Sequence, residues 1–175
     1  REAIGHDDAA ASQALGHVRT AASQALRELR ALVRLLRNPE THQADQSGIS
    51  LAHLATLIEN ARGSGLNVEL DLRGTLDHLP ATVDSAAYRI VQESLTNVIR
   101  HAHATAVLIV ITLDEGTLQI DIRDNGTASA ARLIAGNGIA GMRERARLLG
   151  GSLSVQHGER GGVQVHASLP IGGNE

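Results

Sequence analysis

The segment from Pro80 to Ala102 limits the fold of this chain most strongly, because its apolar residues recur with the period of an α-helix. Proline is favoured in the first turn of a helix, so the helix is expected to begin there. Four aliphatic side chains form its buried stripe: Ile90, Val91, Leu95 and Val98. Four polar side chains fall together on one face: Glu93, Asn97, Arg100 and His101. A helix with such a polar group beside its buried stripe is typical of a functional site.

Two motifs further along the chain indicate the chemistry of this site. Asp124-Asn125-Gly126 ends a strand whose inward side chains are apolar, so the carboxylate is expected at the edge of the core. A glycine-rich segment from Gly136 to Met142 leads into a helix, and glycines let backbone N–H groups close on a phosphate. Alone, each motif is also compatible with an ordinary turn or connector. Together with the polar helix they predict a site for a nucleotide and magnesium.

Composition narrows the class of protein. The 175 residues carry a formal charge of -3, and the pI is near 6.3, which argues against nucleic acid or an anionic membrane as the main partner. There is no cysteine, so disulfides and thiolate metal sites are excluded. No apolar run is long enough to span a bilayer, so any membrane segment is expected outside this chain. Tyr88 is the only aromatic residue, which leaves Leu, Ile, Val and Ala for the core.

Helical and alternating patterns predict the elements after residue 48. Helices are expected at residues 51–61, 80–102 and 139–149. Strands are expected at residues 66–72, 106–113, 117–123, 152–156 and 163–169, with a loop at 125–137. This order predicts an α+β fold, a two-layer α/β sandwich in which helices back one side of a mixed, largely antiparallel sheet.

The N-terminal part of the chain predicts a helix of a bundle. Its apolar residues alternate spacings of three and four, which is the seam of a coiled coil or four-helix bundle: Leu15, Val18, Ala22, Ala25, Leu29, Leu32 and Leu36. We therefore expect three parts. Residues 1–38 belong to a helical bundle, residues 39–48 form a linker, and residues 49–175 form the sandwich domain.

The motifs resemble those of the GHKL superfamily, which has the Bergerat-type ATP-binding fold. The branch of sensor histidine kinases that works with NarL-type response regulators is the most similar. The resemblance rests on Tyr88 to Asn97 and on Gly141-Met142-Arg143-Glu144-Arg145, and it runs from about Leu15 to Pro170. Two positions depart from the pattern of many relatives: Ala128 stands where they have glycine, and Val163 where they have threonine.

The resemblance implies ATP and Mg²⁺ as ligands. It assigns Asn97 as the magnesium ligand and Glu93 as the catalytic carboxylate, which orients or deprotonates the attacking group or organises the water shell of the metal. It also implies that Asp124 accepts the exocyclic amine of adenine. The other residues expected at the nucleotide are Arg100, His101, Gly126, Gly136, Gly138, Ile139, Gly141 and Met142.

The implied activity is transfer of the ATP γ-phosphoryl group to a histidine, and then to an aspartate of a response regulator. The alternatives are a GHKL ATPase that hydrolyses ATP and an ATP-binding partner-switching module without histidine phosphotransfer. We expect a homodimer through the helical bundle of the full-length protein. The expected location is the cytoplasm, with tethering to the inner face of a bacterial membrane as a second possibility. The acceptor histidine is expected upstream of Arg1, with His6 as the alternative.

Overall fold

The computed structural model describes residues 49–76, 78–127, 137–158 and 161–172. The expected bundle helix at 1–38, the linker at 39–48 and the residues 128–136 of the expected loop lie outside the described residues. The described helices are the short 3₁₀-helix η1 (Leu51–His53), α2 (Leu54–Arg62), α3 (Ala81–Asn97), the π-helix η2 (Val98–Ala102) and α5 (Asn137–Leu148). The strands are β1 (Asn67–Arg73), β2 (Ala106–Asp114), β3 (Thr117–Asp124), β4 (Ser152–His157) and β5 (Val163–Pro170).

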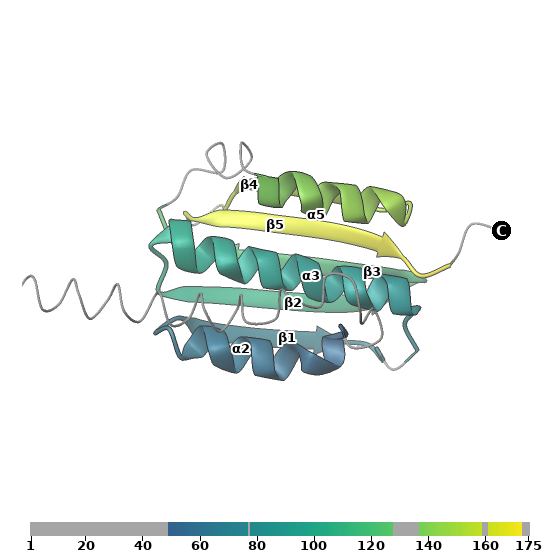
Figure 1. Ribbon diagram of the computed structural model, residues 1–175, viewed down its shortest axis with the longest axis horizontal. Coiled ribbons are helices and arrows are strands. Elements are labelled where there is room, and N and C mark those ends of the chain that lie inside the picture. Colours follow the sequence, from purple (N-terminus) through teal and green to yellow (C-terminus); the bar gives the residue numbers. More distant parts are fainter. Residues whose placement is uncertain (1–48, 77, 128–136, 159–160, 173–175) are drawn as a thin grey trace, which may run out of the picture.

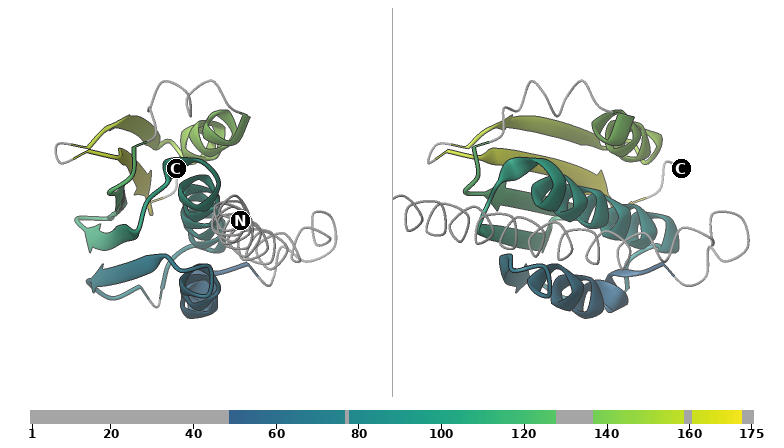
Figure 2. Two further views of the ribbon diagram at one scale, coloured as in Figure 1. Left: turned by 90° about the vertical axis from the view of Figure 1, so that its left-hand side faces the viewer. Right: turned by 60° about the vertical axis from the view of Figure 1, so that its left-hand side comes forward.

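The strands form a five-stranded sheet in the order β1-β2-β3-β5-β4. The β1–β2 pair is parallel and the other three pairs are antiparallel. The helices α2, α3 and α5 lie side by side on one face of this sheet, with α3 in the middle (Figures 1 and 2). This arrangement confirms the predicted α+β two-layer sandwich with a mixed, largely antiparallel sheet.

Aliphatic side chains fill the space between the two layers. Residues of successive strands that point towards the helices are buried, as in Ile109 of β2 and Ile120 of β3. From the other layer, Ile90, Val91 and Leu95 of α3 are fully buried. Each such side chain contributes about 1.5–3 kcal/mol on burial. Tyr88 is also buried in α3, and the rest of the core consists of the aliphatic types and the one methionine.

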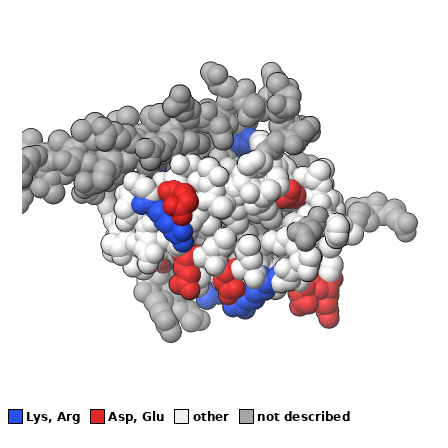
Figure 3. All heavy atoms as spheres, turned by 90° about the horizontal axis from the view of Figure 1, so that it is seen from below, with Lys and Arg blue, Asp and Glu red and all other residues white. Residues whose placement is uncertain are grey.

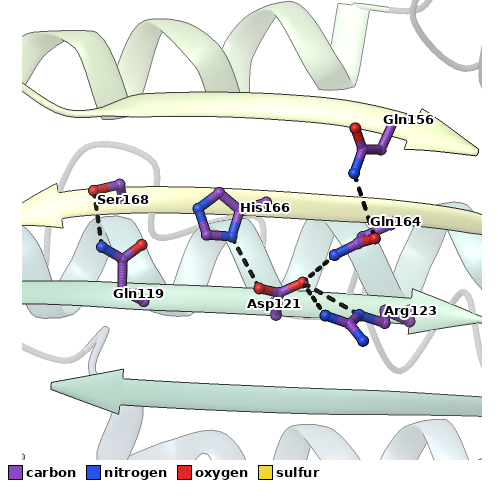
Figure 4. A network of polar contacts seen from close by, with 7 residues as sticks. All are labelled: Gln119, Asp121, Arg123, Gln156, Gln164, His166 and Ser168. Carbon is purple, nitrogen blue, oxygen red and sulfur yellow. Dashed lines mark hydrogen bonds and ion pairs between the residues drawn. The ribbon is translucent and has the colours of Figure 1, made fainter. Parts of the chain in front are cut away.

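The opposite face of the sheet carries a polar network centred on Asp121 of β3 (Figure 4). Its carboxylate accepts hydrogen bonds from Arg123 and Gln164, and Nδ1 of His166 lies 2.9 Å from Oδ2 of Asp121. Burial raises the pKa of Asp121, but the hydrogen bonds from His166 and Gln164 outweigh it, so the pKa lies below its usual value. Because side chains alternate along a strand, every second residue of β3 points to this polar face, and the residues between them point to the buried face.

Charged side chains of both signs lie next to one another on the side of the molecule formed by α2 and β1 (Figure 3). Two exposed ion pairs in this region are Arg62–Glu59, at 2.7 Å, and Arg73–Asp71, at 2.6 Å. Exposed pairs of this kind contribute little to stability, about 0–1 kcal/mol each. None of the described helices is long and apolar enough to cross a membrane.

The end of the long helix differs from the expectation. An α-helix to Ala102 was predicted, but α3 ends at Asn97 and the chain continues as the π-helix η2. A π-helix has i→i+5 hydrogen bonds and therefore a wider turn, so the α-helical spacing behind the predicted alignment of residues 93, 97, 100 and 101 ends at Asn97. His103, with a φ of 51°, then ends η2.

The turn after η2 is held by Asn125. Its side-chain oxygen accepts the N–H groups of Thr105 and Ala106, at 3.0 and 2.9 Å, and its amide nitrogen donates to Oγ1 of Thr105. These bonds attach the end of β3 to the start of β2. The loop that follows β3 therefore leaves the sheet from a fixed point beside η2, where the N–H of Thr127 donates to the carbonyl of Ala102.

Candidate functional site

A pocket lies where α3 and η2 pass over β3 and β5. Its lining residues come from α3, η2, β3, α5 and β5: Ser94, Asn97, Val98, Ala102, Ile122, Asp124, Ile139, Val163 and Val165. The enclosed space among them is small, about 10 Å³, which is room for one water molecule, and it opens to solvent. The lining is mostly apolar, with the three polar side chains Ser94, Asn97 and Asp124. Such a combination of an apolar wall and few polar groups is typical of a binding site for a small molecule.

Asp124 is the buried carboxylate of this pocket. Strand alternation explains its position, because Ile120, Ile122 and Asp124 all point to the helix-covered face of β3. Its Oδ1 accepts the N–H of Gly126 at 2.8 Å, and its Oδ2 accepts the N–H of Val163 at 3.2 Å. Burial raises the pKa of Asp124, and these two backbone hydrogen bonds act in the opposite direction. Each carboxylate oxygen can accept a further hydrogen bond, so Asp124 can also bind a donor from a ligand.

Gly162 makes the close approach of β5 to Asp124 possible. Its φ is 73°, and a methyl group added at Gly162 would lie 2.0 Å from the backbone carbonyl oxygen of Asp124. Only glycine combines this left-handed backbone with so close a contact. Gly162 was not among the predicted site residues. A pair of glycines immediately before a buried strand was the signal that could have identified it.

Gly126, which was expected at the nucleotide, packs closely against the backbone of η2. A methyl group added at Gly126 would lie 2.1 Å from the carbonyl oxygen of Ala102. The absence of a side chain at Gly126 therefore lets the loop after β3 pack against η2. In this way it positions Asp124 from the side of the loop, as Gly162 does from the side of β5.

Asn97 and Glu93 lie one turn apart on α3, as predicted. Asn97 is partly buried in the pocket wall, and its side chain makes no hydrogen bond to any described residue. The Glu93 carboxylate lies against the first turn of α5, because a methyl group added at Gly138 would lie 2.1 Å from its Oε1. The structure thus brings the predicted carboxylate, the predicted glycine segment and the pocket together.

The other predicted residues lie in different surroundings. Ile139 is buried and lines the pocket. Met142 is fully buried between α5 and α3, with its Sδ 3.7 Å from Oγ of Ser94, so it contributes to packing. Arg100 and His101 are exposed on η2 and are not among the residues that line this pocket. Gly136 lies outside the described residues.

Several lining residues were not predicted as site residues. Ser94 and Val98 follow from the helical period next to Asn97, and Val163 and Val165 follow from the alternation of β5. They were assigned to the core or not singled out, because an apolar pocket wall and a core face have the same sequence pattern.

Metal ligands in this part of the molecule are few. Among the described residues no group of three or more His, Cys, Asp or Glu side chains could hold a metal ion. Magnesium keeps several waters and is bound through one or two protein ligands together with phosphate oxygens. The amide oxygen of Asn97 and the nearby Glu93 carboxylate are compatible with that kind of binding.

Comparisons with known proteins agree with this geometry. A family model described as "Histidine kinase-, DNA gyrase B-, and HSP90-like ATPase" matches residues 82–173. Sensor histidine kinase YxjM of Bacillus subtilis is 37% identical over 146 residues, which cover 82% of this chain and 34% of that protein. The nitrate/nitrite sensor protein NarX of Escherichia coli is 27% identical over 125 residues, covering 70% of this chain and 21% of that protein. The chain therefore spans about a third or less of the length of these two relatives.

Among solved structures, the blue-light activated histidine kinase EL346 of Erythrobacter litoralis has a similar fold. Its TM-score is 0.59 at 23% sequence identity, and the match covers 83% of this chain and 48% of that chain. At this level of identity the similarity concerns the fold alone.

The first prediction concerns Gly162, with Gly116 as a matched control. Gly116 has a φ of 76°, and a methyl group added there would meet no atom within 4 Å. Gly116→Ala should therefore lower the free energy of unfolding only by the strain of its left-handed backbone, ~1–2 kcal/mol. Gly162→Ala should lower it by the same strain and by a further ~1–3 kcal/mol of overpacking against Asp124. Urea denaturation of both variants measures the difference, and equal losses would contradict the proposed contact.

Proposed function

The chain belongs to the family of histidine kinase-, DNA gyrase B- and HSP90-like ATPases, and we propose that it is the ATP-binding catalytic part of a two-component sensor histidine kinase. The proposed reaction is transfer of the γ-phosphoryl group of ATP to a histidine, and onward to an aspartate of a response regulator. The named sensor kinases among its relatives support this reading over a purely hydrolytic ATPase.

The buried Asp124 carboxylate is the observation that carries the proposal. It lies in a mostly apolar pocket, held by two backbone N–H groups, with acceptor capacity left over. Adenine offers an exocyclic amine as a donor and a flat apolar ring, which fit this carboxylate and the walls formed by Ile122, Ile139 and Val165. Guanine has a carbonyl oxygen at the corresponding ring position, which a carboxylate would repel.

We propose that Asn97 and Glu93 act at the phosphate end of the nucleotide. Asn97 supplies an uncharged oxygen ligand for magnesium, and its side chain has no partner among the described residues. When bound, the magnesium ion would neutralise the charge of the phosphate groups. Glu93 holds a carboxylate against Gly138, where it can orient an attacking group or a water of the metal. Arg100 and His101 remain proposed phosphate contacts from η2.

The partners and the location are also proposals. The segments Tyr88–Asn97 and Gly141–Arg145 favour a response regulator of the NarL type, and the expected helix at residues 1–38 favours a homodimer. The cytoplasm is the proposed location, because ATP and response regulators are found there. Tethering of the full-length protein to the inner face of a bacterial membrane is the alternative.

Adenine selectivity should depend on Asp124. An unpaired buried polar group costs ~1–3 kcal/mol, so Asp124→Ala should narrow the preference for ATP over GTP by about ten- to a hundredfold. Asp121→Ala is the matched control, because Asp121 lies on the same strand but on the opposite face of the sheet. Competition binding of the two nucleotides gives the ratio. Unchanged selectivity in Asp124→Ala would place the base elsewhere.

The contribution of magnesium to nucleotide affinity should require the side chain of Asn97. Asn97→Ala should lower the affinity for Mg-ATP much more than the affinity for adenosine without magnesium, because only Mg-ATP binding uses the metal. Asn67→Ala on the exposed surface of β1 serves as the control and should change neither affinity. Isothermal titration calorimetry with both ligands separates the cases. Equal losses for the two ligands would rule out the ligand role of Asn97.

A phosphoryl-transfer assay distinguishes a histidine kinase from the two alternatives, a hydrolytic ATPase and a partner-switching module. With the acceptor outside residues 1–175, the chain alone should bind γ-labelled ATP without becoming labelled. The same chain joined to a complete bundle with a His-Asp pair should acquire acid-labile phosphate. Label on the chain alone that is lost in His6→Gln would make His6 the acceptor. Rapid release of phosphate without any phosphoprotein would favour a hydrolytic ATPase, and binding without either reaction would favour a partner-switching module.

A further inference from the structure

Two glycines in the first turns of α5 lie next to charged side chains of opposite sign, Glu93 of α3 and Arg145 of α5. A methyl group added at Gly138 would lie 2.1 Å from Oε1 of Glu93, and one added at Gly141 would lie 3.4 Å from Nη2 of Arg145. Because Gly138 and Gly141 are three residues apart, they lie on the same face of α5. The Arg145 guanidinium therefore folds back along its own helix towards the Glu93 carboxylate, and the two groups lie about one turn apart.

Arg145 is one of four described arginines that lack a carboxylate partner at close range; the others are Arg89, Arg100 and Arg143. Arg62, Arg73, Arg123 and Arg147 each lie within 4.0 Å of a carboxylate, whereas in the described part of the chain Arg145 has neither an ion pair nor a hydrogen-bond acceptor. Burial lowers the pKa of Arg145, and the charge of Glu93 counteracts this effect.

The surrounding charges favour an anion at this point. Arg89 lies on α3 one turn before Glu93, and its Nη1 donates to Oε1 of Gln92 at 2.9 Å. Arg89 and Arg145 carry two positive charges, against the one negative charge of Glu93. Arg145 is exposed, and an arginine with unused donors is suited to a phosphate group, which its planar guanidinium can bind through two hydrogen bonds.

We propose that Arg145 binds the terminal phosphate of a nucleoside triphosphate, and that Glu93 holds the guanidinium over Gly141 before the nucleotide arrives. This inference rests on the proposed ATP site, because the Glu93 carboxylate lies one turn from Asn97 in the pocket wall. Arg145 thereby distinguishes the triphosphate from the diphosphate. It belongs to α5, so the contact would also fix this helix when ATP is bound.

The test compares the affinities of Mg-ATP and Mg-ADP for the chain of 175 residues by isothermal titration calorimetry. Arg145→Gln should weaken Mg-ATP by about ten- to a hundredfold, because a hydrogen-bonded charge pair is lost, and should weaken Mg-ADP by less than about threefold. Arg145→Lys keeps the charge but not the planar fork, so it should give an intermediate loss for Mg-ATP.

Arg147→Gln is the matched control. Arg147 lies two residues further along α5, is exposed and pairs with Glu144 at 2.8 Å, so its loss should change neither affinity by more than about twofold. The ATP-to-ADP ratio is the decisive quantity, because general damage to α5 would weaken both nucleotides equally. Equal losses in Arg145→Gln, or none, would overturn the role of Arg145 while leaving the ATP site intact. A wild-type chain that binds neither nucleotide would overturn the proposed function itself.

Discussion

The two hydrogen bonds of the Asp124 carboxylate are the interactions on which the candidate site depends. They attach the end of β3 to the loop at Gly126 and to the start of β5 at Val163, two segments far apart in the sequence. A carboxylate at a core position is costly unless its oxygens are paired, and here both are paired with backbone N–H groups. The same arrangement leaves acceptor capacity that faces the pocket. Folding and ligand recognition therefore use the same side chain.

Most of the fold could be predicted because periodicity was strong and turns were marked by glycine. The alternation in β2 and β3 specified which face of the sheet is buried, and the helical period from Pro80 specified the buried stripe of α3. The predicted strands agree with the observed strands to within one residue at each end. The position of Asp124 at the end of an inward-facing row could also be predicted, because a strand reverses its side chains at every residue.

Other features could not be predicted from periodicity, because they depend on contacts between distant segments. Nothing in the sequence Val98–Ala102 distinguishes a π-helix from the end of an α-helix, and on η2 Arg100 and His101 are exposed and do not line the pocket with Asn97. Gly126 and Gly138 were expected to lie at the nucleotide, and Gly162 was not singled out. In the structure Gly126 and Gly162 make room for backbone carbonyls, and Gly138 makes room for Glu93. Sequence identifies a glycine that cannot be replaced, but the neighbouring atom that requires it is known only once the chain is folded.

The single tyrosine gives the molecule a simple ultraviolet absorption and fluorescence spectrum. With no tryptophan or phenylalanine, near-ultraviolet absorption and intrinsic fluorescence come from Tyr88 alone. That ring is buried in α3, one turn before Gln92 and Glu93, and burial raises the pKa of its hydroxyl group. Its signal therefore reports the packing of one helix rather than an average over many chromophores. A nucleotide that changes how α3 lies on the sheet can be followed in the unmodified chain, and adenine, which absorbs near the same wavelengths, must be subtracted from any absorbance measurement.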